Sequence, residues 1–555
     1  LPAIFIYHDL QFDFIGNVKT HFRIPKTKKV FCKEINSHSI DKYYSGTALL
    51  LFPFFCTAHS LSLLGNYSAD GYSELYQYAV TFAALIFLLI GCYFVLKILD
   101  FYSATQLESI VVLLITVFGT NLVYYAISEP SLSHVYSFCM IAGFIFYIKK
   151  SIISTLPKYI IISSIILGII ILIRPVNVMV ISVIPFLTEK PDVFLKWCKK
   201  IIQMPLILLL AGIIVFSIIS IQFILNFYQT GVFFVWAYQD EGFVFSNPQF
   251  FNVLFSYAKG LFIYTPIIFI SLLSLIYVFK QSSFQLFGLM LFLFIITYVI
   301  SSWWTWQYGM SFGHRIFIDF YFIVSVMLLF TIRLINNKIW KEIFITIGIL
   351  AITVNNIQAY QYRNYILLWM DMDKEKYWQV FLKTDKKYKG IFWDNGPKNI
   401  DLKKEICLVN NFDNPPQLAK SILKSNFAFS GNNVTYVSAN HKYGAEYKIL
   451  LDSLFKKVGK DTIVIKAQAM VRAQNTKSNL IIALETLNSV KPLHWYSVNV
   501  NNRINNSSAN WTKIESDQYT LTVTDTLQKA LKIYPLYLDG DTSFFDDIGI
   551  RLINK

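Results

Sequence analysis

Long apolar runs constrain this chain more than any other feature of its sequence. Between residues 75 and 363 they follow one another with short polar breaks. A helix that crosses a membrane needs about 20 mostly apolar residues. We expect such helices at 75–98, 107–127, 132–148, 157–173, 175–188, 201–227, 260–280, 284–302, 316–335 and 342–363. The runs are rich in β-branched residues, but in lipid a helix prevails because it satisfies its own backbone hydrogen bonds.

The predicted fold is therefore a polytopic α-helical membrane protein with about ten spanning helices. The runs 157–173 and 175–188 are short and meet at Arg174-Pro175. They form either two tilted helices or one broken pair, so the count can change by one or two. The run 46–64 either spans the membrane or lies along its outer interface, as amphipathic helices do.

The composition agrees with a membrane protein. Of 555 residues, 55% are hydrophobic and 15% are charged, whereas soluble globular chains carry about 25% charged residues. This excludes an ordinary soluble enzyme and a disordered chain. A net charge of +15 would suggest a nucleic-acid partner for a soluble protein. Here membrane lipids are the expected partner, because basic residues hold loops in the cytoplasm and contact anionic headgroups.

Cysteine and metal-ligand patterns add no site. The six cysteines include no CxxC pair, which argues against a zinc or redox motif. No metal cluster is visible in the sequence, and a divalent metal ion is left open as a cofactor. Because the sequence begins with Leu1, we expect the numbered chain to start inside a longer protein.

Lysines in short loops set the expected orientation, since such loops stay in the cytoplasm. They fall at alternate loop ends: Lys97, Lys149, Lys150, Lys158, Lys196, Lys199, Lys200, Lys280, Lys338 and Lys341. The opposite loops are then external: 128–134, the turn at Arg174, 228–259, 303–315 and everything after about 364. We expect a multi-pass protein of the inner membrane whose C-terminal domain is periplasmic.

Composition also divides the chain. We expect an external juxtamembrane segment at 1–74, a helical membrane domain at 75–364, an interfacial connector at 365–400 and a β-sandwich at 401–555. The last prediction rests on short alternating segments such as Thr462–Ala467, Asn479–Leu484 and Tyr519–Val523. Polar clusters separate them, as in antiparallel sandwiches.

Two charged residues stand at external helix ends. Glu129 lies before Pro130 and close to His134, and a carboxylate there could act as a base on a hydroxyl group. The alternative is a solvated loop acid. Arg174 follows a mostly apolar run, where a guanidinium is costly unless it is paired or wet. A phosphate would satisfy its charge and fork geometry, whereas a snorkelling side chain is the alternative.

The external stretch 301–315 carries the densest pattern. Trp303, Trp304 and Trp306 can stack on sugar rings and donate N–H groups to hydroxyls. His314 and Arg315 supply positive charge for an anion, and Asp319, one turn later, could pair with Arg315. An aromatic belt at the membrane interface explains the tryptophans equally well, but it does not explain the residues from Gly309 to Arg315.

A third external region supplies acids and a tyrosine. Asp240, Glu241 and Tyr264 complete the expected sugar and acceptor pocket, although a solvated loop and a helix start would explain them as well. The chain has no Gly-rich phosphate loop and no G-x-S-x-G motif. No soluble nucleotide-sugar domain with a DxD motif is recognised, so a cytosolic nucleotide-sugar donor is not expected.

The order of these features resembles the GT-C membrane glycosyltransferases, especially the protein O-mannosyltransferase and aminoarabinose-transferase branch. Residues 41–50, Asp-Lys-Tyr-Tyr-Ser-Gly-Thr-Ala-Leu-Leu, are similar to that branch's K-Y-x-x-x-P-x-G-x-x-L element, without its prolines. This favours the interfacial placement of 46–64. Ser128-Glu129-Pro130 resembles the branch's second acidic site, and Arg174-Pro175 its basic turn. Residues 1–5, 69–72 and 303–315 also look like uncharacterised GT-C-like proteins of the Bacteroidetes type.

The resemblance implies a transferase that moves a sugar, with inversion, from a polyprenyl-phosphate donor to a glycan, lipid or protein acceptor on the periplasmic face. Glu129 would serve the acceptor, and Arg174, His314 and Arg315 would hold the donor phosphate. The family's leading catalytic acid would fall before Leu1, and Asp9 and Asp13 do not match its motif. A non-catalytic subunit of an envelope assembly and a transporter of lipid-linked glycans are therefore the alternatives.

Overall fold

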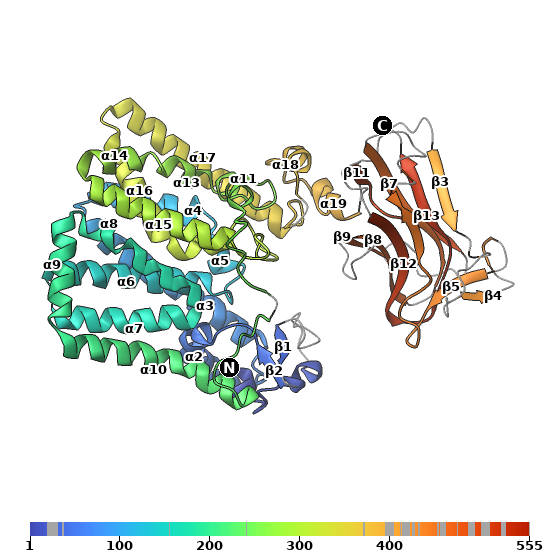
Figure 1. The fold of residues 1–555 in the computed structure, drawn as a ribbon, viewed down its shortest axis with the longest axis horizontal. Helices are drawn as coiled ribbons and strands as arrows, with labels where there is room; N and C mark the ends of the chain where they lie inside the picture. The colour runs from blue at the N-terminus through green and yellow to red at the C-terminus, as the bar shows by residue number, and fades with distance from the viewer. Residues whose placement is uncertain are drawn as a thin grey trace. The chain divides into compact units, whose positions relative to one another are not determined.

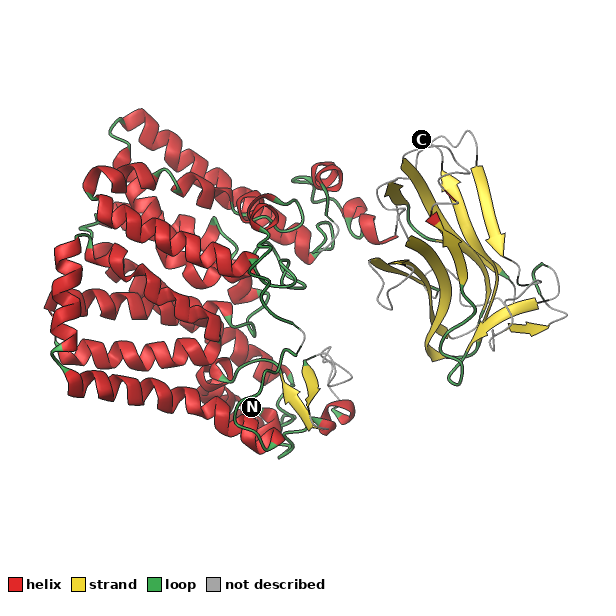
Figure 2. Ribbon diagram, in the orientation of Figure 1, coloured by secondary structure: helices red, strands yellow, loops and turns green. Residues whose placement is uncertain are grey.

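The computed structural model divides into two compact units, Leu1–Lys389 and Gly390–Lys555. Helices make up most of the first unit and strands most of the second (Figure 2). The structure describes residues 1–18, 31–35, 38–154, 156–239, 241–369, 372–394, 405–410, 412, 422–424, 428–430, 433–451, 454, 462–473, 476–486, 494–500, 511–522 and 529–553.

The first unit begins with short elements and continues as a helical bundle (Figure 1). The short elements are α1 (Pro2–Phe5), η1 (Asp13–Asn17) and the antiparallel hairpin β1 (Cys32–Ile35) and β2 (His38–Asp41). The bundle up to the long loop after residue 230 comprises α2 (Gly46–Leu64), α3 (Glu74–Asp100), α4 (Gln106–Phe118), α5 (Leu122–Ile127), α6 (His134–Ser154), α7 (Pro157–Ile173), η3 (Pro175–Val183), α8 (Ile184–Thr188), α9 (Pro191–Ile202) and α10 (Pro205–Thr230).

The remaining helices follow that loop. They are α11 (Phe250–Phe255), α12 (Leu261–Tyr264), α13 (Pro266–Ser271), α14 (Ser274–Gln281), α15 (Ser283–Ser301), η4 (Arg315–Phe320), α16 (Tyr321–Leu334), α17 (Lys338–Arg363), α18 (Lys374–Val380), η5 (Lys386–Tyr388) and α19 (Ile391–Asp394).

Seven helical segments among the described residues are long and apolar enough to cross a membrane. They are Gly46–Leu64, Glu74–Asp100, His134–Ser154, Pro205–Thr230, Ser283–Ser301, Arg315–Leu334 and Lys338–Arg363. Four shorter apolar segments, Gln106–Phe118, Pro157–Ile173, Pro175–Thr188 and Pro266–Gln281, coincide with further predicted spans. Each of the ten predicted runs is thus helical. The count of ten spans is not confirmed, because these four segments are shorter than the roughly 20 residues that a span needs. Gly46–Leu64, which we placed at the interface, is long and apolar enough to cross a membrane.

Local sequence explains several boundaries. At the start of α4, the Thr105 hydroxyl accepts the Glu108 backbone N–H while the Glu108 carboxylate accepts the Thr105 N–H, which is a capping box. Arg174 ends α7 in an extended conformation, because Pro175 disfavours a helical residue before it. At Gly46, an added Cβ would lie 2.3 Å from the backbone nitrogen of Ile173. Glycine therefore lets α2 start against the end of α7.

The two ends of the bundle differ. Helix α9 contacts α10 and crosses the bundle at one end (Figure 1). It carries Lys196, Lys199 and Lys200, and none of its residues is buried. The hairpin β1–β2 and the loop 302–314 lie at the other end, next to the termini of α10 and α15. The lysine-rich end is the one that we expect in the cytoplasm.

The second unit contains two antiparallel sheets. Its strands are β3 (Glu405–Asn410), β4 (Ile422–Lys424), β5 (Asn433–Val437), β6 (Tyr447–Leu450), β7 (Thr462–Arg472), β8 (Thr476–Thr486), β9 (His494–Asn499), β10 (Thr512–Glu515), β11 (Tyr519–Thr522), β12 (Lys529–Gly540) and β13 (Ser543–Ile553). One sheet has the order β10-β7-β13-β5-β4, with β11 also on β7 and β3 also on β13, and the other has the order β6-β12-β8-β9.

A shared apolar core holds these sheets together. It includes Ile465 and Ala467 of β7 in the larger sheet, and Leu480 and Ile482 of β8 in the smaller one. Side chains alternate along each strand, so one face of each sheet is apolar. Two sheets that bury such faces against each other form a sandwich, which agrees with the predicted fold of this region.

Candidate functional site

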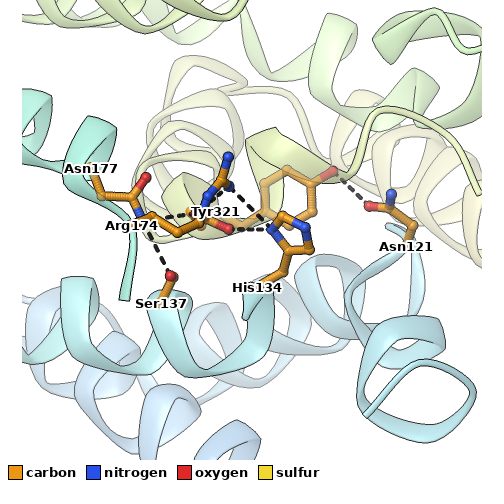
Figure 3. Close-up of polar contacts among 7 residues, drawn as sticks. Asn121, His134, Ser137, Arg174, Asn177 and Tyr321 are labelled. Atoms are coloured by element: carbon orange, nitrogen blue, oxygen red, sulfur yellow. Dashed lines mark hydrogen bonds and ion pairs between the residues drawn. The ribbon is translucent and has the colours of Figure 1, made fainter. Parts of the chain in front are cut away.

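A buried carboxylate organises the end of the bundle opposite α9, which we expect to be the outer end. Asp319 lies on η4 and is 0% exposed. It accepts hydrogen bonds from His134 Nδ1 at 2.7 Å, Arg174 Nη1 at 3.0 Å and Asn177 Nδ2 at 2.8 Å. Asn177 also donates to the Ser137 hydroxyl at 3.1 Å. Figure 3 shows how His134, Arg174 and Asn177 converge from α6, the α7–η3 turn and η3.

This arrangement differs from the pairing of Asp319 with Arg315 that the sequence suggested. The guanidinium that reaches Asp319 belongs to Arg174, which is 145 residues away along the chain. A buried carboxylate is tolerated when a cation and several donors surround it, and Asp319 has both. Arg174 is thereby fixed at the helix end, and its side chain stays 18% exposed.

A second set of hydrogen bonds fixes the chain just before Arg315. The Tyr125 hydroxyl donates to the Phe312 carbonyl at 3.0 Å and accepts the Phe312 N–H at 2.9 Å. Asn121 donates to the same carbonyl and accepts from the Tyr321 hydroxyl (Figure 3). Gly313 has a φ of +59°, which side-chain-bearing residues rarely adopt. These contacts fix the backbone just before Arg315, where η4 begins.

Lys259 contacts the loop 302–314, which carries Trp303, Trp304 and Trp306 and which we name the tryptophan loop. Its side chain is fully buried, and Nζ contacts the carbonyls of Gln307 and Gly309 and, at 2.5 Å, the Ser311 hydroxyl. Burial, together with the nearby Arg315 charge, lowers the pKa of Lys259 to about 6. The amine is therefore mostly neutral at pH 7, and its role here is to hold the loop.

Arg315 is the cation that this network leaves without a carboxylate. Among the described residues none lies within ion-pair distance of its guanidinium. Its Nε is buried without a hydrogen-bond partner, and Nη1 is 3.5 Å from the Met310 carbonyl, which is at the limit of a hydrogen bond. A half-buried guanidinium with unused donors is suited to binding an anion.

Glu129 lies within electrostatic reach of Arg315. It stands in the loop between α5 and α6 and is half-buried. Burial raises the pKa of Glu129 above its usual range, while the Arg315 charge acts in the opposite direction. The structure thus brings these two predicted residues into one region. A carboxylate with a raised pKa and a nearby cation is an arrangement often found at catalytic sites.

His314 differs from its neighbour in charge. It is 1% exposed, its Nε2 lies 3.1 Å from the Trp306 carbonyl, and its Nδ1 has no hydrogen-bond partner in the described part of the chain. Burial lowers the pKa of His314 to about 3, so the ring is neutral at pH 7. Any contact with a phosphate would then be a hydrogen bond to a neutral ring.

The predicted pocket residues occupy different places. Trp303 packs edge-on against Tyr238 and Phe243 and stacks on Tyr308, whereas Trp304 is 53% exposed. Trp306 contributes its carbonyl to His314. The charges of Arg174 and Arg315 both act on Tyr308, so the aromatic cluster of Trp303 and Tyr308 lies close to the two arginines.

Tyr264 and Glu241, two other predicted pocket residues, have contacts of their own. Tyr264 is buried and donates to the Tyr257 carbonyl, so it packs the interior. Glu241 forms ion pairs with Lys33 and Lys42 at 3.3 and 3.9 Å, which tie its loop to the β1–β2 hairpin. Asp240 lies outside the described residues. Within the described ranges no group of three or more potential metal-ligating side chains is found.

Sequence reasoning missed the roles of Asn121, Tyr125 and Asn177. All three are polar, fully buried and bonded across the bundle. The sequence could have indicated that these residues are bonded, because a polar side chain in an apolar run needs a hydrogen-bond partner. It could not identify the partner, since each partner lies far away in the sequence.

Comparison with known proteins leaves the family open. No protein-family model matches the chain, and no curated protein matches it. Among solved structures, it is similar to the arabinosyltransferase EmbB from Mycobacterium smegmatis, with 10% sequence identity and a TM-score of 0.31. The match covers 84% of this chain and 57% of that chain. A TM-score this low establishes neither a common fold nor a common activity, so no residue role is transferred from that enzyme.

Proposed function

We propose that this chain is a membrane glycosyltransferase of the GT-C type. It would move a sugar from a polyprenyl-phosphate donor to an acceptor hydroxyl at the outer face of the membrane. The observation that carries this proposal is the state of Arg315, which is half-buried at the outer end of the bundle and has no carboxylate partner among the described residues. A lipid-linked phosphate would supply the missing anion at this depth.

The proposed reaction assigns a task to each charged group. The acceptor oxygen attacks the anomeric carbon, its proton passes to Glu129, and the bond from that carbon to the phosphate oxygen breaks. The leaving lipid phosphate gains negative charge, which the guanidinium of Arg315 offsets. Arg174 touches Asp319 through Nη1 only, so its other N–H groups remain for the same phosphate. The neutral His314 contributes shape or a hydrogen bond.

Binding of a polyprenyl phosphate without sugar tests the donor site directly. The protein would be placed in phospholipid nanodiscs, and its affinity compared between the parent and Arg315→Ala. A charge-assisted hydrogen bond contributes about 1.5–3 kcal/mol, so we expect binding roughly tenfold to a hundredfold weaker. Arg315→Lys keeps the charge and loses the fork, so it should fall between the two.

Lys338→Ala is the matched control, because it removes one positive charge at the other end of the bundle from a side chain that is 91% exposed. Equal affinity in the parent and in Arg315→Ala would rule out the assignment of Arg315. Binding without sugar transfer to any acceptor would instead favour a non-catalytic subunit or a transporter.

A further inference from the structure

The segment 231–255, which comprises the loop after α10 and the short helix α11, has two contrasting sides. Its inward side carries the polar contacts. Val244 N–H donates to the Ser302 carbonyl at 2.6 Å, and Gln249 N–H donates to the Ser301 carbonyl at 2.8 Å. Trp304 N–H donates in turn to the Gly242 carbonyl at 2.9 Å. The loop is thereby bonded to the outer end of α15.

The other side is apolar and exposed. Phe234 and Phe251 are the most exposed of its side chains, at 76% and 73%. The full set comprises Val232, Phe233, Phe234, Trp236, Val244, Phe245, Phe251 and Phe255. We name this set the aromatic strap. Exposed apolar patches of this kind mark interaction sites, because isolated soluble surfaces rarely keep them.

Among the described residues, the charge of this segment lies on the inward side, at Glu241. Asp240 and Glu241 are the only charged residues between 231 and 255, and Glu241 is paired with Lys33 and Lys42. The single indole in the strap, that of Trp236, donates to the Glu241 carbonyl at 3.1 Å. The strap itself therefore presents hydrocarbon, chiefly phenylalanine rings, which lack the polar tip that holds Trp and Tyr at the headgroup level.

The strap continues the exposed apolar surface of two candidate membrane spans. It starts where α10 ends, and α10 exposes Phe216, Ile224 and Phe227 along its length. At its far end Phe250 and Phe245 stack on Tyr298 of α15, which in turn stacks on the exposed Phe294. Both flanking helices are among the candidate spans. Exposed apolar side chains are thus found on both candidate spans and on the segment between them.

We propose that the aromatic strap is inserted in the outer leaflet of the membrane, below the headgroups, and that its partner is the acyl chains of phospholipids. Glu241 of the same loop faces the β1–β2 hairpin. Tyr238 lies close enough to Arg174 for the arginine charge to act on its hydroxyl group. The strap therefore lies between the proposed lipid contact and the aromatic side chains close to Arg174 in the candidate site. This inference stands apart from the glycosyltransferase proposal, since it needs no donor.

Photocrosslinking in a defined bilayer tests the insertion. p-Benzoylphenylalanine would replace Phe234 or Phe251, and the protein would be placed in vesicles of phosphatidylethanolamine and phosphatidylglycerol without polyprenyl lipid. Phe216, which is 63% exposed in the middle of α10, is the lipid-facing reference, and Tyr443 of the β-sandwich is the reference for non-specific reaction. We expect phospholipid adducts at both strap positions, in yields comparable with that at Phe216.

A loss of lipid adducts at both strap positions, with the adduct at Phe216 kept, overturns the proposal. So do adducts to the β-sandwich or to a second chain, which would identify a protein partner. A second measurement uses Phe234→Cys, Phe251→Cys and Tyr443→Cys with a membrane-impermeant maleimide, after subtraction of the parent's labelling. Phe234→Cys and Phe251→Cys should react with the maleimide far more slowly than Tyr443→Cys. Equal labelling rates would contradict insertion.

Discussion

At the scale of single residues, the two arginines of the outer bundle end differ in what surrounds them. Arg174 is paired with Asp319, whereas Arg315 has no such partner among the described residues. The first guanidinium is held by a carboxylate from another helix, and we propose that the second binds an anion that is not part of this chain. Two similar sequence signals thus lead to different expected effects on substitution.

Asp319→Asn should destabilise the fold. The change leaves the Arg174 charge largely buried without a carboxylate, and removing one partner of a buried pair costs about 3–5 kcal/mol. We expect a clear fall in the apparent melting temperature of the detergent-solubilised protein. Asp100→Asn is the control, because its ion pair with Lys97 is exposed and such pairs contribute about 0–1 kcal/mol. Similar stability of the two variants would contradict the structural role.

Glu129→Gln should slow sugar transfer while leaving donor affinity nearly unchanged. Loss of a general base lowers rates by about 10²–10⁴, and removing a negative charge near Arg315 does not weaken anion binding. Because the pKa of Glu129 is raised, parental activity should fall on acidification at a higher pH than an ordinary glutamate would give. Glu342→Gln, at an exposed site, is the control. Full activity of Glu129→Gln would show that Glu129 is a solvated loop residue without a role in catalysis.

At the scale of elements, the loop 302–314 depends on a buried amine beneath it. Three oxygen atoms of this loop surround Nζ of Lys259, and the loop passes through positive φ at Tyr308, Gly309 and Gly313. Such a conformation persists only when surrounding contacts determine it. The placement of Arg315, the next residue after the loop, follows from those contacts.

Lys259 should make stability depend on pH. Its pKa is about 6 in the folded chain and near 10.4 when unfolded. Between these values the unfolded state binds more protons, so stability rises with pH, by up to about 1.4 kcal/mol per pH unit. The apparent melting temperature should therefore increase from pH 6 to pH 9. Lys259→Met should flatten that slope, and an unchanged slope would show that the amine is charged in the folded state.

At the scale of the whole molecule, two units have separate cores. The strand unit buries its own apolar cluster between its two sheets, and contacts divide the chain at Lys389–Gly390. A unit with its own core can in principle fold alone. The helical unit and the sandwich can therefore be studied as distinct parts of one chain.

The C-terminal unit should lie outside the cytoplasm. Arg333, Lys338 and Lys341 mark a cytoplasmic loop, and one further candidate span, Lys338–Arg363, follows it. A reporter that is active only outside the cytoplasm should work when it is fused after Lys555. The same reporter fused after Ile335 should stay inactive. Activity with the opposite pattern would reverse the orientation of every loop described above.

The sequence by itself determined that the long apolar runs are helices, that the C-terminal region is rich in strands and that the loops near Glu129, Arg174 and Arg315 share one end of the bundle. An apolar run of about 20 residues has one way to satisfy its backbone in lipid, and alternation marks a strand. Only the tertiary structure decided that Asp319 pairs with Arg174, that Lys259 lies beneath the tryptophan loop and that Glu241 faces two lysines. Hydropathy acts along each segment, whereas an ion pair depends on a separation of a few ångströms between residues that are remote in the chain.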